Sequence, residues 1–154
     1  MQDIMSVEAI VGLVSVGISA VVSWIVAKVT IERNDKSALE CELSEILKIG
    51  IERPYLEQTQ FTTSWKPELA ESDDRYATYD LYATLVFNYL EKVCKFYRFR
   101  YDRIQREIDM HSWVKNHETY WNNPIQNYEN ILGYDLRFVE LIDKKILKRV
   151  KRDD

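Results

Sequence analysis

Uncharged residues run without interruption from Ala9 to Ala27, bounded by Glu8 and Lys28. As an α-helix, such a stretch would be about 28 Å long at a rise of roughly 1.5 Å per residue, close to the hydrocarbon thickness of a bilayer. A secretory signal peptide has basic residues before a shorter apolar run and a cleavage site, whereas acidic residues, Asp3 and Glu8, precede this one. The pattern predicts a retained transmembrane helix. The alternative, a buried core helix, would need a larger surrounding fold than the remaining chain provides.

The charges around this stretch predict its orientation. The basic residues that flank it all follow its C-terminal end: Lys28, Arg33 and Lys36. The positive-inside rule then places Met1 outside and the chain after Ile31 in the cytoplasm. We therefore expect two regions, a tail with a transmembrane helix in residues 1–31 and a cytoplasmic regulatory and oligomerisation domain in residues 32–154.

Small and hydroxyl-bearing residues share one side of the predicted span. At 100° per residue, one stripe with an arc of about 80° holds them, together with an acid at its outer end: Glu8, Gly12, Ser15, Ser19, Ser23 and Thr30. Such stripes let helices approach closely, and hydroxyls can bond across the contact. Two interpretations stay open. The stripe is a contact between copies of the chain, or it lines a polar path through a ring of helices with Glu8 at the mouth.

Apolar residues after Ile31 recur at helical spacing, and no stretch alternates with the period of two that is typical of strands. The predicted helices cover residues 31–49, 67–71, 75–109, 112–123, 125–132 and 135–150. The fold class is therefore all-α, with one N-terminal transmembrane helix followed by a cytoplasmic helical bundle.

The two longest soluble helices have clear faces. In residues 75–109 the predicted inward face is Val86, Leu90, Val93, Tyr97, Tyr101, Ile104 and Ile108. The opposite face of the same helix carries Lys92, Lys95, Arg103 and Arg106, with Phe99 among them. In residues 135–150 the predicted inward face is Leu136, Val139, Ile142, Ile146 and Val150.

Charge is segregated along the chain. The total, 21 Lys and Arg against 25 Asp and Glu, gives a net charge of −4, which excludes a uniformly basic nucleic-acid coat. Residues 92–106 nevertheless hold six basic residues and one acidic residue, and residues 144–154 hold six and two. In the first tract the basic residues alternate with Phe96, Tyr97, Phe99 and Tyr101.

This combination leaves three interpretations of the basic tracts. They bind a nucleotide or single-stranded nucleic acid, through phosphate contacts and base stacking. They pair with acidic residues, within the chain or across subunits. They contact anionic lipid. The first interpretation assigns the ligand to Lys92, Lys95, Phe99, Arg103 and Arg106.

Residues that could support catalysis are few. His111 and His117 match neither HExxH nor a zinc spacing, and no glycine-rich phosphate loop is present. His117 is one helical turn from Trp113 and Trp121, which favours a packed histidine, and Cys94 is interpreted as a buried thiol. The acidic cluster in the predicted loop is interpreted as solvated: Glu71, Asp73 and Asp74. We expect no enzymatic activity, no metal and no cofactor.

Three features together carry a resemblance: the serine-striped span from Gly12 to Ser23, the tract from Lys92 to Arg106, and the aromatic-rich part from Trp113 to Tyr134. In this layout the chain resembles single-span membrane effectors of bacterial antiphage defence, above all the membrane effectors of the Hailong system. The resemblance implies a tetrameric ion channel of the inner membrane. It also implies control by a nucleotide or single-stranded DNA oligomer that a nucleotidyltransferase partner makes. The alternative is a non-channel, single-pass anchor that recruits a cytosolic partner.

Overall fold

The computed structural model describes the backbone of residues 7–125 and 133–148 and the side chains of residues 19–125 and 133–148. Every regular element in these ranges is helical, which confirms the all-α class. The chain divides into two units, residues 1–38 and residues 39–154. Each unit is described by itself.

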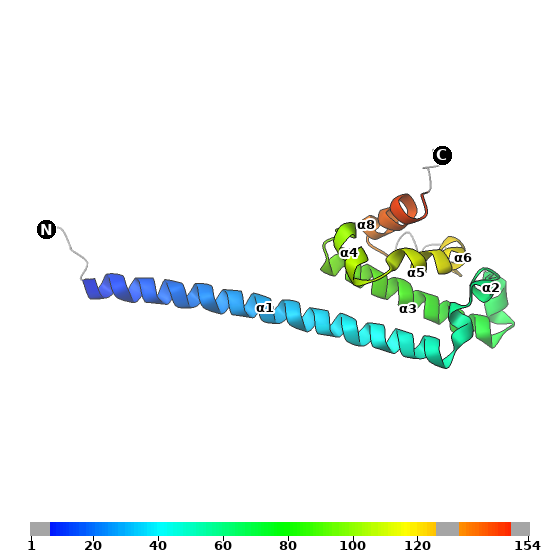
Figure 1. Cartoon of the computed structure of the whole chain (residues 1–154), viewed down its shortest axis with the longest axis horizontal. Coiled ribbons are helices and arrows are strands. Elements are labelled where there is room, and N and C mark those ends of the chain that lie inside the picture. The colour runs from blue at the N-terminus through cyan, green and yellow to red at the C-terminus, as the bar shows by residue number, and fades with distance from the viewer. Residues whose placement is uncertain (1–6, 126–132, 149–154) are drawn as a thin grey trace. The chain divides into compact units, whose positions relative to one another are not determined.

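The first helix, α1, runs from Val7 to Glu52 (Figure 1). The helix predicted after Ile31 is therefore a direct continuation of the one predicted before it. Within the described residues, no helix combines the length and the hydropathy that a membrane crossing requires. Residues 9–18 of the predicted span lie outside the described side chains.

The second unit is built around α3, which runs from Asp74 to Phe96 and contributes nine buried residues to the core. The other elements of this unit, besides the end of α1, are η1 (Pro54–Glu57), α2 (Thr59–Thr62), η2 (Pro67–Glu71), α4 (Tyr101–Glu107), α5 (Met110–Asn116), α6 (Glu118–Asn122), α8 (Leu136–Glu140) and the π-helix η3 (Leu141–Ile146). α4, α5 and α6 lie along one side of α3 (Figure 1). The short helix predicted at residues 67–71 is confirmed by η2. Residues 126–132, where a further helix was predicted, lie outside the described residues.

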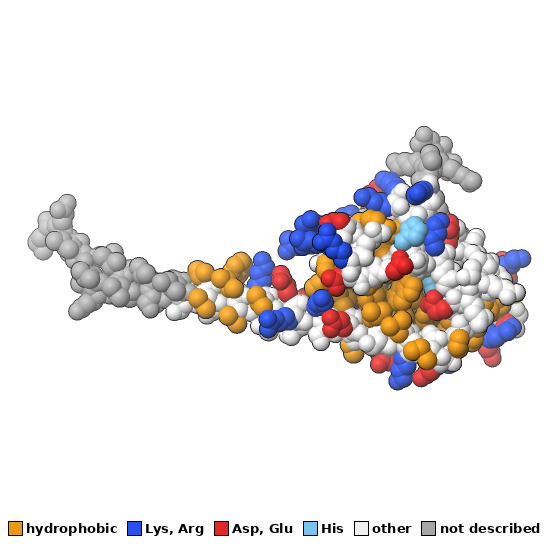
Figure 2. Space-filling view, viewed as in Figure 1, with side chains coloured by type: hydrophobic (Ala, Val, Ile, Leu, Met, Phe, Trp, Pro, Cys, Tyr) orange, Lys and Arg blue, Asp and Glu red, His pale blue; other side chains and the backbone are white. Residues whose placement is uncertain are grey.

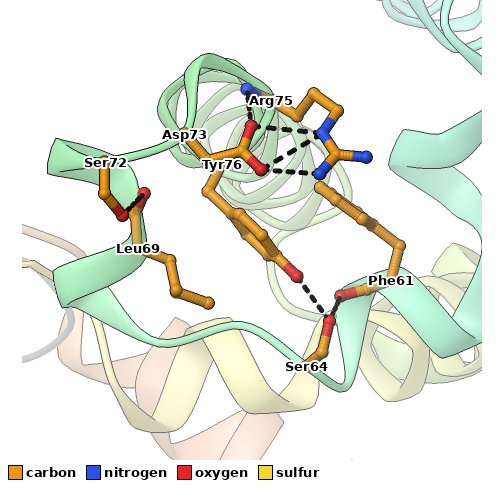
Figure 3. A network of polar contacts seen from close by, with 7 residues as sticks. All are labelled: Phe61, Ser64, Leu69, Ser72, Asp73, Arg75 and Tyr76. Carbon is orange, nitrogen blue, oxygen red and sulfur yellow. Dashed lines mark hydrogen bonds and ion pairs between the residues drawn. The ribbon is translucent and has the colours of Figure 1, made fainter.

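The start of α3 is fixed by a compact polar and aromatic network (Figure 3). Asp73 caps the helix by accepting the Arg75 backbone N–H at 2.9 Å, and it also accepts from the Arg75 guanidinium at 2.6 Å. The Tyr76 hydroxyl lies 2.7 Å from Ser64 Oγ, and the Tyr76 ring stacks on Phe61 with centroids 4.5 Å apart. Asp73, from the predicted solvated cluster, therefore has a structural task as an N-cap.

The single helix predicted for residues 75–109 is wrong, because α3 ends at Phe96 and α4 begins at Tyr101. The Phe99 N–H donates to the Cys94 carbonyl at 2.7 Å and the Arg98 N–H to the Lys95 carbonyl at 3.1 Å. These are the two bonds of a Schellman motif, in which the residue after the cap is left-handed. Arg98 has φ 53° there, where glycine is usual, so the sequence shows no sign of the helix end.

The predicted apolar face is confirmed on both sides of the turn between α3 and α4. Val86, Leu90, Val93 and Ile104 are buried, and Tyr97, Tyr101 and Ile108 are partly buried against the same core. The apolar pattern therefore gave the correct burial across two helices. The helical wheel, which relates Lys92 and Lys95 to residues of α4, does not hold beyond Phe96.

Two further predictions need correction in the later helices. The helix predicted for residues 112–123 is divided at His117 into α5 and α6. In the last helix, Leu136 is 68% exposed instead of facing inward, whereas Phe138 and Leu141 are buried. The segment passes into a π-helix, whose wider turn changes the register between α8 and η3. Ile142 and Ile146 are buried as predicted, and Val150 lies outside the described residues.

Candidate ligand-binding surface

Six basic side chains from two distant segments gather where α3 gives way to α4, and we call this surface the basic corner. Its members are Arg98, Arg100, Arg103, Arg106, Arg137 and Lys145, all of them exposed. Figure 2 shows Lys and Arg side chains gathered over the part of the molecule where α4 lies. The first four come from the turn after α3 and from α4, and the last two from α8 and η3.

Cation–π contacts bring the two segments together. The Arg137 guanidinium lies over the Phe99 ring at 4.2 Å from its centroid, and Lys145 Nζ lies 5.7 Å from the centroid of the Tyr101 ring. Such contacts attract a cation to the negative face of the ring. The two basic tracts of the sequence, interpreted separately, therefore contribute to one surface.

Most of the arginines in the basic corner have no acidic partner among the residues that the structure describes. Among the described residues, no salt bridge joins an acid to Arg98, Arg103 or Arg106. Arg100 lies 3.7 Å from the exposed Asp102. Unpaired guanidinium groups present planar donors that match the oxygen atoms of phosphate or carboxylate groups.

Arg137 is the paired member of the basic corner. It forms a fork with Asp135 at 2.7 Å, and the hydrogen bonds from Arg137 lower the pKa of Asp135 to about 2.

The backbone of the basic corner is strained. Arg98 and Phe99 both have left-handed φ angles, 53° and 57°. A left-handed conformation costs roughly 1–2 kcal/mol for a residue with a Cβ. Strain of this kind concentrates at functional sites. The turn places Arg98 and Arg100 in solvent on either side of the partly buried Phe99.

The structure separates the five residues predicted to bind a ligand. Lys92 pairs with Glu42 of α1 at 2.7 Å, and Lys95 pairs with Glu91 at 2.8 Å, so an acid neutralises each of these charges. Phe99, Arg103 and Arg106 meet at the basic corner, and one face of the Phe99 ring is covered by Arg137.

Four residues of the basic corner were missed in the prediction: Arg98, Arg100, Arg137 and Lys145. The first two belong to the basic run of residues 92–106, but the wheel of an unbroken helix excluded them. Arg137 and Lys145 can be assigned to this surface only from their tertiary contacts with Phe99 and Tyr101.

The residues predicted to line a pore are described in part. Ser19 and Ser23 are exposed on α1. Glu8, Gly12 and Ser15 belong to α1, but their side chains lie outside the described residues.

A second polar group lies in the second unit, and we call it the buried polar cluster. Its members Tyr79, Tyr82 and His117 are buried, and Glu57 and Asn116 are partly buried. The Tyr82 hydroxyl donates to Glu57 Oε1 at 2.5 Å, and Asn116 Nδ2 donates to Glu57 Oε2 at 3.0 Å. Tyr79 and His117 Nδ1 are 2.9 Å apart, and His117 Nε2 lies 3.5 Å from Glu57 Oε1. His117 is fully buried, which confirms the packed histidine, although its ring neighbours are Tyr79 and Tyr82.

Burial and hydrogen bonding have opposite effects on the ionisable groups of this cluster. Burial raises the pKa of the Glu57 carboxyl, but the nearby His117 ring and the hydrogen bonds from Tyr82 and Asn116 outweigh it, so the pKa is lowered overall. Burial raises the pKa of Tyr79 and of Tyr82, which therefore keep their protons as donors. Among the described residues, no group of His, Cys, Asp and Glu side chains has the arrangement of a metal site.

Comparisons with protein-family models, with curated proteins and with solved structures found no match for this chain.

Proposed function

We propose that the chain is a single-pass membrane protein whose copies assemble into an ion-conducting pore controlled by a ligand at the basic corner. In this proposal residues 9–27 span the bacterial inner membrane with Met1 outside, and the second unit lies in the cytoplasm. The proposed biological role is that of an antiphage effector, with a nucleotidyltransferase partner as the source of the ligand.

The observation that carries the proposal is the exposure of large apolar side chains around most of the circumference of α1. Between residues 21 and 31, seven large apolar side chains are 41–65% exposed: Val21, Val22, Trp24, Ile25, Val26, Val29 and Ile31. Consecutive residues point about 100° apart, so these positions cover more than half of the helix circumference and leave only the side with the small, hydroxyl-bearing stripe free of large apolar side chains. Lipid, or other copies of the chain, would cover such a helix. Lys28 Nζ lies 5.3 Å from the centroid of the Trp24 ring, and both residue types are typical of the membrane interface.

The polar stripe supports assembly. Ser19 and Ser23 lie one turn apart, and Gly12 and Ser15 continue the same stripe in the sequence. In a membrane, helices associate through small residues and hydroxyl groups. A ring of such helices, a tetramer by the resemblance, would turn the stripe towards a central path, with Glu8 at its outer mouth.

The basic corner supports control by an anionic ligand. Three arginines that have no acidic partner in the described part of the chain lie next to Tyr101 and Phe99, and such a surface suits a nucleotide or a single-stranded DNA oligomer. A ligand shifts an equilibrium between closed and open states by the difference in its affinity for the two. We therefore expect the open fraction to depend on ligand concentration.

Ion flux from vesicles tests the pore. The purified chain in lipid vesicles is expected to release a trapped ion or dye, and Ser19→Leu is expected to abolish the release by filling the stripe. Val21→Leu is the matched control, because residue 21 points to the opposite side of α1 and its substitution keeps the stripe open. Inserted protein that releases nothing in either form would refute the pore.

Oligonucleotide binding tests the ligand. The affinity for a short single-stranded DNA should fall steeply with salt, with a slope in log K of about 0.7 per phosphate contact. Arg103→Glu with Arg106→Glu should abolish binding, whereas Lys66→Glu, an exposed residue outside the basic corner, should leave it intact. Unchanged binding in the double variant would remove the basic corner from the proposal.

A second candidate function is a non-channel anchor that recruits a cytosolic partner. It is favoured by exposed leucines on α3, where Leu81 is 68% and Leu85 is 41% exposed on the same face. An anchor would bind membranes without any flux, so the vesicle assay separates the two candidates.

A further inference from the structure

The chain changes direction immediately after α1, and the buried polar cluster holds this joint. α1 ends at Glu52, and η1 follows at Pro54–Glu57. Gly50, in the last turn of α1, lies against the Tyr82 hydroxyl, which would be 3.2 Å from a Cβ at that position. The same hydroxyl donates to Glu57. Tyr82 of α3 thus touches the chain on both sides of the joint.

The Glu57 carboxylate connects three parts of the second unit. One oxygen accepts from Tyr82 of α3, and the other accepts from Asn116 at the end of α5. Asn116 also donates to the Glu57 carbonyl at 3.2 Å, and its Oδ1 lies 3.4 Å from the hydroxyls of Thr59 and Thr62. A single side chain therefore joins the segment after α1 to both α3 and α5.

One buried nitrogen of this network, His117 Nε2, is left without a hydrogen bond in the part of the chain that the structure describes. The Tyr79 hydroxyl keeps its proton and can donate to His117 Nδ1, so a neutral His117 carries its hydrogen on Nε2. His117 Nε2 is buried and has no hydrogen-bond partner among the described groups, yet it faces Glu57 Oε1 at 3.5 Å. Buried N–H groups are nearly always paired. A shift of Glu57 by roughly half an ångström would bring this pair to hydrogen-bonding distance.

We propose that Glu57 is the movable part of a latch that holds the end of α1 (residues 39–52) to the rest of the second unit. In one state the carboxylate bonds Tyr82 and Asn116, as observed. In the other it turns towards His117 Nε2 and releases Asn116, so that residues 53–62 loosen. The inference rests on the proposed function in one respect, that a change at this joint would be passed along α1 towards the proposed span.

Hydrogen–deuterium exchange of the full chain in detergent tests the latch. Glu57→Gln puts an amide donor opposite the Asn116 donor, and Tyr82→Phe removes a hydroxyl while it keeps the ring. Each variant is expected to speed exchange in residues 53–62 about tenfold, as the loss of a charge-assisted hydrogen bond predicts. Exchange in the core of α3, residues 86–94, should not change. Glu68→Gln, an exposed glutamate on η2, is the matched control and should change neither segment.

Two results would overturn the latch: equal acceleration in residues 53–62 and 86–94, which is general destabilisation, or no acceleration in either variant. Because exchange needs no conductance, its outcome is separate from the vesicle assay. Local loosening without ion flux in any variant would keep the latch and remove the pore. Ion flux without local loosening would keep the pore and remove the latch.

Discussion

The basic corner and the buried polar cluster use polar side chains in opposite ways within the same unit. In the buried polar cluster, Glu57 accepts from Tyr82 and Asn116, and the tyrosines keep their protons as donors. In the basic corner, Arg98, Arg103 and Arg106 have no acidic partner among the described residues, and the backbone is strained at Arg98. Paired buried groups support the fold. Exposed arginines without an acidic partner among the described residues do not stabilise the fold in this way, which is why we propose an external ligand for the basic corner.

The largest effect on the free energy of unfolding is expected from removing the buried side chain of His117. His117→Ala leaves a cavity and the Tyr79 hydroxyl without its partner, so the free energy of unfolding should fall by about 3 kcal/mol. Urea unfolding measures this change. His111→Ala, at the exposed histidine, is the control and should stay within about 0.5 kcal/mol of the unchanged chain. A loss below 1 kcal/mol for His117→Ala would mean that the cluster does not stabilise the fold.

A pH series should give the next largest effect. The pKa of Glu57 is lowered from 4.5 in the folded chain. The ionised carboxylate therefore stabilises the fold fully above that ordinary pKa, and this contribution is lost as the pH falls through the lower, folded value. The difference in unfolding free energy between the unchanged chain and Glu57→Gln should be larger at pH 7 than at pH 3. A difference that is the same at both pH values would show that the charge of Glu57 is not involved. Glu68→Gln serves as the pH-matched control.

The smallest expected effect is an increase in stability, from a substitution at Arg98. Arg98→Gly relieves the left-handed strain and should raise stability by about 0.5–1 kcal/mol in thermal unfolding, while it weakens binding of an anionic ligand. Arg100, with φ −81°, is an unstrained neighbour, so Arg100→Gly should not stabilise the chain. Equal effects of the two glycines on stability would show that the strain at Arg98 is not the cause.

The sequence predicts local features of this chain well and its long-range partners poorly. The spacing of Val86, Leu90, Val93 and Ile104 predicted their burial, because periodicity depends on neighbours in the chain. The helix end at Phe96 was missed, because arginine occupies the left-handed position where glycine would have marked it.

The same limit applies to the candidate site. Arg103 and Arg106 were identified from their charge and spacing. Arg137 and Lys145 join them only through contacts with Phe99 and Tyr101, which no periodicity encodes. His117 was expected to pack, but Tyr79 and Glu57, its polar partners, are 38 and 60 positions away in the sequence. Polar contacts between residues so far apart in the sequence follow from the tertiary fold.

The two cysteines of the chain differ in a way that helps experiments. Cys94 is fully buried against Met110, and burial raises its pKa to about 12, whereas Cys41 is exposed on α1. Since thiol reagents attack the accessible thiolate, a maleimide dye would label the folded chain at position 41 alone. The natural sequence thus provides one attachment point for a fluorophore or spin label, without any cysteine having to be removed.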